Sequence, residues 1–276
     1  MNDANEIINR IETFLRQQTE LYSDVNFDLI DSVPTATAET IPVSLADRVN
    51  AVSSPGPEDQ VQISENLSDN TAITSIPPNN KDIMPLSNVS TLDELYELCL
   101  VTPELRTDLP DTRLVFGKGN PTADLMLIGE APGAEEDKLG EPFVGRSGQL
   151  LTKILEAINI TRDQIYIANI LKHRPPENRN PLPEERKRSL PYLLKQIELI
   201  NPKLILCLGK ISAETLLGQS STMKEMRGTF HIFSEKYELL VTYHPAALLR
   251  NPNWKRETWE DVQLLRKRYD ELGCKP

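Results

Sequence analysis

The part of this sequence that could do chemistry is an acidic, glycine-rich loop that follows an apolar run. The run LMLIG ends at Gly129, and the loop continues as EAPGAEEDKLGEPFVGRSG to Gly148. A loop that cradles phosphate would avoid so many carboxylates, and the sequence lacks the G-x-x-x-x-G-K-[ST] pattern of nucleoside triphosphate sites. The purpose of so many carboxylates must therefore follow from the residues that surround the loop.

A flat heterocycle fits the residue types that accompany this loop. Pro132 and Gly133 favour a tight turn that leaves backbone N–H groups free to point at a ligand. Phe143 offers an aromatic face, Asn169 offers a donor and an acceptor, and His244 offers an imidazole. Uracil matches this set, because its N3–H and O4 can take both ends of an amide. Its O2 can accept from an imidazole or a backbone N–H.

Alternating strands and helices are predicted to bring these residues together. Buried strands are predicted from the apolar runs ADLMLIG (123–129), QIYIANIL (164–171), KLILCLG (203–209) and ELLVTYH (238–244). Helices are predicted over 147–158, 184–200, 210–217 and 256–271. This α/β pattern favours a three-layer α/β/α sandwich with a central four-stranded parallel sheet. Ligands bind such sheets at the carboxyl ends of the strands, where Glu130, Asn169 and His244 fall.

The N-terminal third differs from the rest in charge and composition. The 276-residue chain has a net charge of −11, yet residues 1–90 hold 14 acidic and 4 basic side chains. We expect an amphipathic helix within residues 1–25, a largely disordered acidic linker over 26–90 and a folded domain over 91–276. The helix is either a solvated tail or a docking site for a protein partner.

We expect the protein to be a monomer and to reside in the cytoplasm. No apolar run reaches the ~18 residues of a membrane span, and the N-terminus lacks the shape of a signal peptide. The three cysteines are far apart and odd in number, which favours a reducing compartment such as the bacterial cytoplasm over a disulfide framework.

The motifs together resemble the uracil-DNA glycosylase superfamily. The stretches that carry the resemblance are GEAPGAEEDKLGEPFVGRSGQLL, YIANILKHRPPENRNPLPEE, KQIELINPKLILCLG and TYHPAALLRNP, which span roughly residues 113–272 in order. The closest group is the bacterial family 4, or thermostable-type, enzymes. The resemblance implies hydrolysis of the N-glycosidic bond of deoxyuridine that has been flipped out of DNA.

The resemblance also implies a role for each matching residue. It makes Glu130, Glu136 and His244 the catalytic residues, the histidine stabilising negative charge on uracil O2. It makes Ala131, Pro132, Gly133, Phe143 and Asn169 the substrate-binding residues, with Phe143 stacking on the base. A carboxylate near C1′ can stabilise a sugar cation and orient water, and donors near O2 can stabilise the leaving anion.

DNA binding is expected from basic and apolar residues around this site. The segment AALLR implies a wedge that enters the duplex, formed by Leu248, Leu249 or Arg250. The phosphate contacts are expected from Arg146, Ser147, Lys172, Arg174, Arg227 and Arg250. Binding should then weaken steeply with salt. The basic cluster Arg186-Lys187-Arg188 is predicted to be a solvated helix face instead.

The sequence departs from the family where an iron–sulfur cluster is held. The four cysteine positions of family 4 correspond to Cys99, Thr102, His173 and Ser189. A cluster requires thiolates, so we expect no cluster, no metal and no other cofactor. His173 is then expected at the surface or on the DNA side of the domain.

Three functions remain open from the sequence. The first is a uracil-DNA glycosylase of base-excision repair. The second is a protein that binds uracil-containing DNA without turnover, which the altered cluster positions favour. The third is a glycosylase-like accessory domain of a DNA-processing complex, for example with a polymerase, which the N-terminal extension favours.

Overall fold

Residues 85–275 are the part of the chain that the structure, a computed structural model, describes. The predicted helix of residues 1–25 and the predicted linker up to residue 84 lie outside this part. The linker was predicted to extend to residue 90, which is wrong for its end, because Val89 is 2% exposed and packs into a core cluster. The strands are β1 (Lys118–Gly119), β2 (Leu125–Gly129), β3 (Tyr166–Asn169), β4 (Leu204–Leu208), β5 (Phe230–Phe233) and β6 (Tyr237–Thr242). The α-helices are α2 (Leu92–Val101), α3 (Ala134–Leu139), α4 (Arg146–Ala157), α5 (Pro183–Ile200), α6 (Lys210–Leu217), α7 (Met223–Met226), α8 (Pro245–Arg250) and α9 (Lys255–Glu271). Short 3-10 turns are η1 (Leu86–Asn88), η2 (Pro103–Leu105), η3 (Arg162–Gln164), η4 (Pro176–Asn178) and η5 (Pro252–Trp254).

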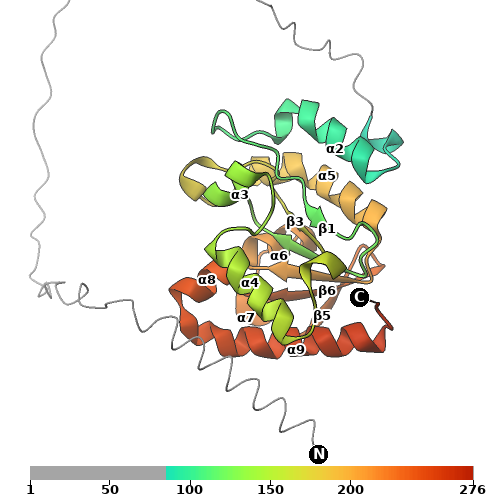
Figure 1. The fold of residues 1–276 in the computed structure, drawn as a ribbon, viewed down its shortest axis with the longest axis vertical. Helices are drawn as coiled ribbons and strands as arrows, with labels where there is room; N and C mark the ends of the chain where they lie inside the picture. Colours follow the sequence, from blue (N-terminus) through green and yellow to red (C-terminus); the bar gives the residue numbers. More distant parts are fainter. Residues whose placement is uncertain (1–84, 276) are drawn as a thin grey trace, which may run out of the picture. The chain divides into compact units, whose positions relative to one another are not determined.

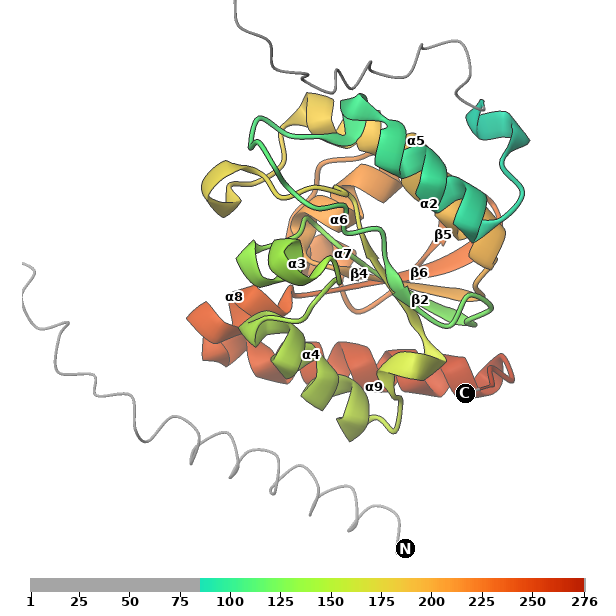
Figure 2. The ribbon, with the colours of Figure 1, turned by 45° about the horizontal axis from the view of Figure 1, so that its top comes forward.

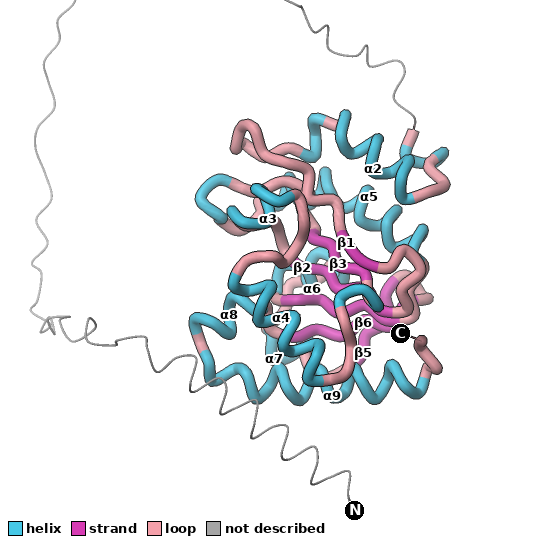
Figure 3. Tube along the Cα trace, in the orientation of Figure 1, coloured by secondary structure: helices cyan, strands magenta, loops and turns pink. Residues whose placement is uncertain are grey.

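A six-stranded sheet in the order β1-β3-β2-β4-β6-β5 forms the centre of the described domain (Figures 1 and 3). The inner strands β3, β2, β4 and β6 pair in parallel, which confirms the predicted parallel sheet. The predicted number of four strands is wrong for the whole sheet, because β1 and β5 add antiparallel edges. Strand β1 has only two residues and β5 is half-exposed, so neither forms the apolar run by which a buried strand is recognised.

Helices cover both faces of the sheet, as predicted (Figure 2). Successive side chains of a strand point to opposite faces, and β2 shows the result. Leu125 and Leu127 pack into a core cluster with residues of α4 and α9. Met126 and Ile128 pack into the opposite cluster with residues of α5 and α6. A smaller cluster joins α2 to the outer side of α5.

The carboxyl ends of the parallel strands meet at one edge of the sheet. Gly129, the last residue of β2, lies beside Asn169, the last residue of β3. On the other side of β2 and β4, strand β6 ends at Thr242, and His244 follows immediately as the N-cap of α8. The fold therefore delivers the three predicted polar positions to the same edge.

The described domain contains neither a helix that could span a membrane nor a disulfide. None of the helices between residues 85 and 275 is long and apolar enough to cross a membrane. All three cysteines of the chain, Cys99, Cys207 and Cys274, are free thiols.

Candidate active site

A pocket of about 350 Å³ opens at the carboxyl edge of the sheet. Its walls come from the loop after β2, the end of β3, the loop before α5 and the start of α8. It is lined by Glu130, Ala131, Pro132, Gly133, Glu136, Phe143, Ser147, Asn169, Pro175, Asn178, Arg179, Asn180, His244, Ala246 and Arg250. All predicted catalytic and substrate-binding residues thus line a single cavity.

Asn169 brings an unsatisfied acceptor to this pocket. Its side chain is 1% exposed, and its buried Oδ1 has no hydrogen-bond partner. Buried polar atoms are nearly always paired, and leaving one unpaired costs about 1–3 kcal/mol. An acceptor kept in this state at a pocket wall is suited to a ligand N–H.

Gly129 leaves the space that Asn169 and Phe143 occupy. A Cβ at Gly129 would overlap Asn169 Oδ1 and would lie 2.6 Å from Phe143 Cζ. Such contacts are too close for real side chains, so the two pocket residues can converge only because position 129 has none. This is why the apolar run of β2 must end in glycine.

Phe143 is held in a left-handed backbone conformation by groups of opposite charge. Its φ is 54°, a conformation that costs a residue with a bulky side chain about 1–3 kcal/mol. Arg162 donates from its two terminal nitrogens to the carbonyl oxygens of Phe143 (3.1 Å) and Pro142 (2.8 Å). On the other side, Glu136 Oε1 accepts from the N–H groups of Val144 and Gly145, both at 3.0 Å.

Glu136 therefore serves the loop as well as lining the pocket. Its side chain is buried, and one carboxylate oxygen is engaged by two backbone N–H groups at the start of α4. A carboxylate fixed in this way positions the Phe143 loop. The catalytic role that the resemblance implied for Glu136 stays a prediction beside this one.

His244 presents a defined tautomer. Its Nδ1 accepts from the N–H of Ala246 at 3.1 Å, so the ring proton sits on Nε2. Burial, with the charge of Arg250 acting in the same direction, lowers the pKa of His244 to about 4. The imidazole is thus neutral at pH 7, with a single N–H available to a ligand.

The surroundings of Glu130 in the pocket shift the pKa of its carboxyl group. Burial raises the pKa of Glu130, and the positive charges of Arg186 and Arg250 oppose this rise. Arg186 lies on α5 in the basic cluster that was predicted to be a solvated face, so that prediction is wrong for this residue. Its partly buried guanidinium lies close enough to Glu130 to act on the site.

The predicted DNA-binding residues divide into exposed and buried groups. Arg146 and Arg250 are exposed near the pocket, and Ser147 and Leu249 are half-buried. Arg174 is half-buried, and its Nε donates to Asn178 Oδ1 at 2.7 Å. These five positions remain compatible with a DNA surface.

Two of the predicted DNA contacts are wrong, and a third is already engaged. Lys172 is fully buried beneath the sheet edge, so its ammonium cannot reach a phosphate. Leu248 is 1% exposed because α8 turns it into the core, so it cannot act as a wedge. Arg227 is paired with Asp261 at 3.0 Å and lies over the ring of Tyr243.

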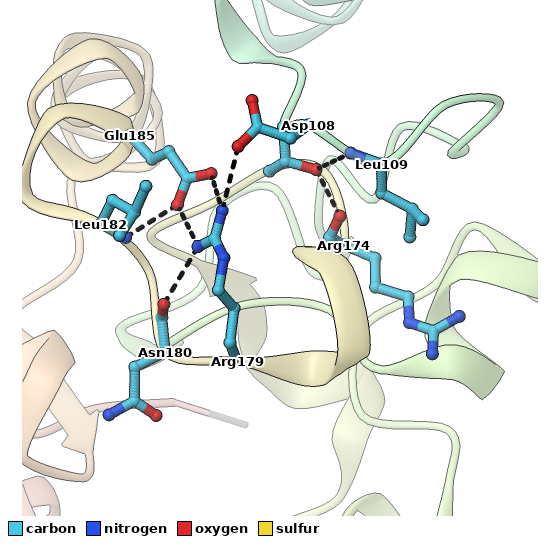
Figure 4. Close-up of polar contacts among 8 residues, drawn as sticks. Asp108, Leu109, Arg174, Arg179, Asn180, Leu182 and Glu185 are labelled. Carbon is cyan, nitrogen blue, oxygen red and sulfur yellow. Dashed lines mark hydrogen bonds and ion pairs between the residues drawn. The ribbon is translucent and has the colours of Figure 1, made fainter. Parts of the chain in front are cut away.

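A set of ion pairs and hydrogen bonds around Arg179, here called the Arg179 clamp, shapes the loop before α5 and was missed by the sequence analysis (Figure 4). Arg179 donates to both carboxylate oxygens of Glu185 at 2.8 Å and approaches Asp108 at 3.5 Å. Glu185 also accepts from the N–H of Leu182 at 2.7 Å, which ties the clamp to the start of α5. The signal was present in the motif PPENRNP, which follows the Asn169 strand and contributes Pro175, Asn178, Arg179 and Asn180 to the pocket lining.

The four positions of the family's cluster do not fit an iron–sulfur group. Thr102 and Ser189 donate their hydroxyls to the carbonyl oxygens of Leu98 (2.7 Å) and Ile170 (2.6 Å). His173 Nδ1 pairs with Thr112 Oγ1 at 3.0 Å. Burial raises the pKa of the Cys99 thiol to about 11, which opposes the thiolate that iron requires. His173 is 3% exposed, so its predicted place at the surface or on the DNA side is wrong.

Comparison with known proteins points to the same family that the sequence motifs resemble. A family model described as the uracil DNA glycosylase superfamily matches residues 116–263. The chain is similar to a type-4 uracil-DNA glycosylase of Archaeoglobus fulgidus, with 40% identity over 184 residues, covering 64% of this chain and 92% of that protein. It is also similar to a type-4 uracil-DNA glycosylase of Thermotoga maritima, with 41% identity over 180 residues, covering 63% and 94%.

A third similarity concerns a much longer protein. A DNA polymerase of Bacillus phage SP01 is 29% identical over 150 residues, which are 54% of this chain and 16% of the polymerase. The family match covers more than half of this chain, and the type-4 relatives are covered almost completely. With its strand-end pocket built from the residues of these motifs, the chain belongs to the uracil-DNA glycosylase superfamily.

Proposed function

We propose that this protein is a uracil-DNA glycosylase of base-excision repair, which hydrolyses the N-glycosidic bond of flipped-out deoxyuridine. The reaction releases uracil and leaves an abasic site. The observation that carries the proposal is the buried, unpaired Oδ1 of Asn169 in a pocket with a neutral His244 and a desolvated Glu130.

Asn169 reads the base in this proposal. Its Oδ1 accepts from uracil N3–H, and its amide nitrogen donates to O4. Cytosine carries no proton on N3 and has an amino group in place of O4, so it would meet the amide with like groups at both positions. A site built for particular donors and acceptors rejects such analogues strongly because buried polar groups are then left unpaired.

His244 and Glu130 act on the two charges of the transition state. As the bond between C1′ and N1 breaks, its electron pair moves to uracil and is delocalised onto O2, where the Nε2–H of His244 donates. The sugar becomes cationic, and the Glu130 carboxylate stabilises it and accepts the proton of the water that adds to C1′. The neutral imidazole suits this role because it donates without carrying a full charge into the pocket.

Phe143 and the rim residues hold the extruded nucleotide. Taking a base out of the stack costs a few kcal/mol, which aromatic stacking and hydrogen bonds in the pocket offset. The exposed Arg146 and Arg250 would contact phosphates beside the pocket. Leu249 and Arg250 are the remaining candidates for the wedge.

The test is alkaline cleavage of a fluorescent oligonucleotide that contains one uracil, with Asn169→Ala as the matched variant. We expect cleavage by the wild type and a loss of about 100-fold or more in the variant. Folded wild-type protein that leaves the oligonucleotide intact would overturn the proposal. A complex with DNA that survives denaturant, without release of uracil, would support the non-turnover alternative.

We also propose that the reaction needs no iron–sulfur cluster or other cofactor. The support is chemical, since two of the four positions are hydroxyls engaged with backbone carbonyls. Iron and acid-labile sulfide should be far below one cluster per chain in active protein purified without oxygen. Stoichiometric iron that is lost together with activity would contradict this.

A polymerase-associated role is the second candidate function. The similarity to part of a phage DNA polymerase favours it, since a domain of this kind there belongs to a polymerase chain. In this proposal the domain is a monomer in the bacterial cytoplasm, where its three free thiols would persist, and residues 1–25 contact the protein partner. Pulldown of the replicative polymerase by the full chain, but not by a chain lacking residues 1–84, would support it.

A further inference from the structure

Lys172 is a buried cation that the proposed mechanism does not use. The side chain is fully buried, three residues after Asn169. Its Nζ donates to the carbonyl oxygens of Asn169 (3.0 Å) and Phe116 (3.3 Å), and to Oε1 of Gln196. An ammonium has three N–H groups, so these three acceptors satisfy it completely.

None of the three acceptors of Lys172 is a carboxylate. Burying a charge without an opposite charge is costly, and the pKa of Lys172 is lowered by this burial to about 8. An apolar side chain of similar length would avoid that cost. The presence of a lysine at position 172 therefore requires an advantage that an apolar residue would not give.

The contacts of Lys172 identify this advantage. Hydrogen bonds from a charged donor are shorter and stronger than neutral ones. The bond from Lys172 fixes the carbonyl of Asn169, the residue whose unpaired Oδ1 faces the pocket. Gln196 adds to the same network, because its Nε2 donates to the Phe116 carbonyl at 3.0 Å. The network thus ties the end of β3 to α5 and to the segment before β1.

We propose that Lys172 is a positioning residue that acts through Asn169, holding the backbone of this residue so that its amide stays aligned with uracil. The inference rests on the proposed function. It assigns Lys172 no contact with the substrate. A misplacement of about 1 Å at a reacting or reading group can cost about 100-fold in rate, so a loss of this support should be visible in kcat.

A double-mutant cycle separates this role from a general structural one. We expect Lys172→Met to lower kcat by about 10- to 100-fold with KM changed less than about 3-fold. In the Asn169→Ala background the same change should cost less than about 3-fold, because the residue through which Lys172 acts is gone. Equal losses in both backgrounds would overturn the proposal, and would indicate general destabilisation or a direct effect of the charge.

Ser189→Ala is the matched control. Its hydroxyl donates to the carbonyl of Ile170, the residue next to Asn169, so the variant removes a buried hydrogen bond of similar position. We expect Ser189→Ala to lower the thermal midpoint while kcat stays within about 3-fold of the wild type. A loss as large as that of Lys172→Met would contradict a specific link to Asn169.

A readout without turnover keeps the inference separate from the proposed function. The side-chain amide of Asn169, assigned in a 15N spectrum by its absence in Asn169→Ala, should shift or broaden in Lys172→Met and not in Ser189→Ala. An unchanged amide signal would overturn the inference even if the enzyme is active, and a changed one would support it even if uracil is not released. If Lys172→Met does not fold, Gln196→Leu removes one acceptor and should show the same pattern with a smaller loss.

Discussion

The rings of Phe143 and His244 contact each other in the pocket, with centroids 5.4 Å apart and planes tilted by 34°. Rings at this separation pack directly, so no base can lie between them. They form one wall of the pocket, in which the aromatic surface and the Nε2–H donor are fixed relative to each other. Substitution of either ring should disturb the other.

His244→Ala should lower kcat by about 100- to 1,000-fold, the cost of removing one donor from a developing anion. The same change removes the support of the Phe143 ring, so KM should also rise. Steady-state kinetics on a uracil oligonucleotide would check this, with His231→Ala as the control. His231 lies on β5, away from the pocket, and forms a hydrogen bond with the Met226 carbonyl at 2.8 Å. Its loss should leave kcat within about 3-fold of the wild type.

Gly129→Ala should abolish most activity while the protein still folds. The added methyl would overlap Asn169 Oδ1 and the tip of Phe143, and both are side-chain atoms that can turn aside. We expect a loss of at least about 100-fold in kcat/KM from the misplaced amide, with a small fall in thermal midpoint. Activity within about 3-fold of the wild type would show that the pocket tolerates the methyl and that Asn169 is not held as described.

Arg162→Met should loosen the Phe143 loop. The change removes two hydrogen bonds from a charged donor to the carbonyls of Pro142 and Phe143, which compensate the left-handed backbone of Phe143. We expect the free energy of unfolding to fall by about 1.5–3 kcal/mol, and kcat to fall with it. Urea unfolding and kinetics measure the two effects, and Arg162→Lys should restore little because an ammonium cannot bridge both carbonyls as a fork. Full rescue by lysine would show that only the charge matters.

Sequence reasoning located the site because the fold makes strand ends converge. Asn169 and His244 each follow an apolar run, and parallel strands bring their carboxyl ends to one edge. The direction of a side chain outside a regular element is harder to predict. Lys172 and Arg174 are both basic residues of one loop, yet only the lysine turns inward, because Gln196 on α5 and two backbone carbonyls accept from it.

Long-range partners explain the other misses. Arg162 reaches a carbonyl 19 residues away, a pairing that no local pattern reveals. Leu248 has the apolar character of a wedge, but in α8 it faces the core cluster shared with α4 and α9. The edge strand β5 has no fully buried position, which hides its strand pattern. These features depend on packing between segments that lie far apart in the sequence.

Arg250→Gln should change both DNA binding and the pH profile. Removing one phosphate contact should lower the slope of log binding constant against log salt by about 1. The charge of Arg250 favours ionised Glu130, so its loss should raise the pKa of Glu130 further. The proposed reaction requires Glu130 in its ionised form, so the acidic limb of kcat/KM, which reports the free enzyme, should move to higher pH. An unchanged acidic limb together with a reduced salt slope would show that Arg250 acts in DNA binding only.

The stability of the fold should fall as the pH is lowered through the range in which its buried histidines titrate. Burial lowers the pKa of His173 to about 4, whereas a histidine in the unfolded chain titrates near 6.5. Between these values the unfolded state binds more protons, so stability is present above about pH 6.5 and is lost as the pH falls toward 4.

His173→Asn keeps an acceptor for Thr112 Oγ1 but does not titrate. Urea unfolding at pH 7 and pH 5 should therefore show a fall that is smaller by about 1–2 kcal/mol in the variant than in the wild type. Identical falls in the two proteins would show that His173 is not held neutral in the folded state.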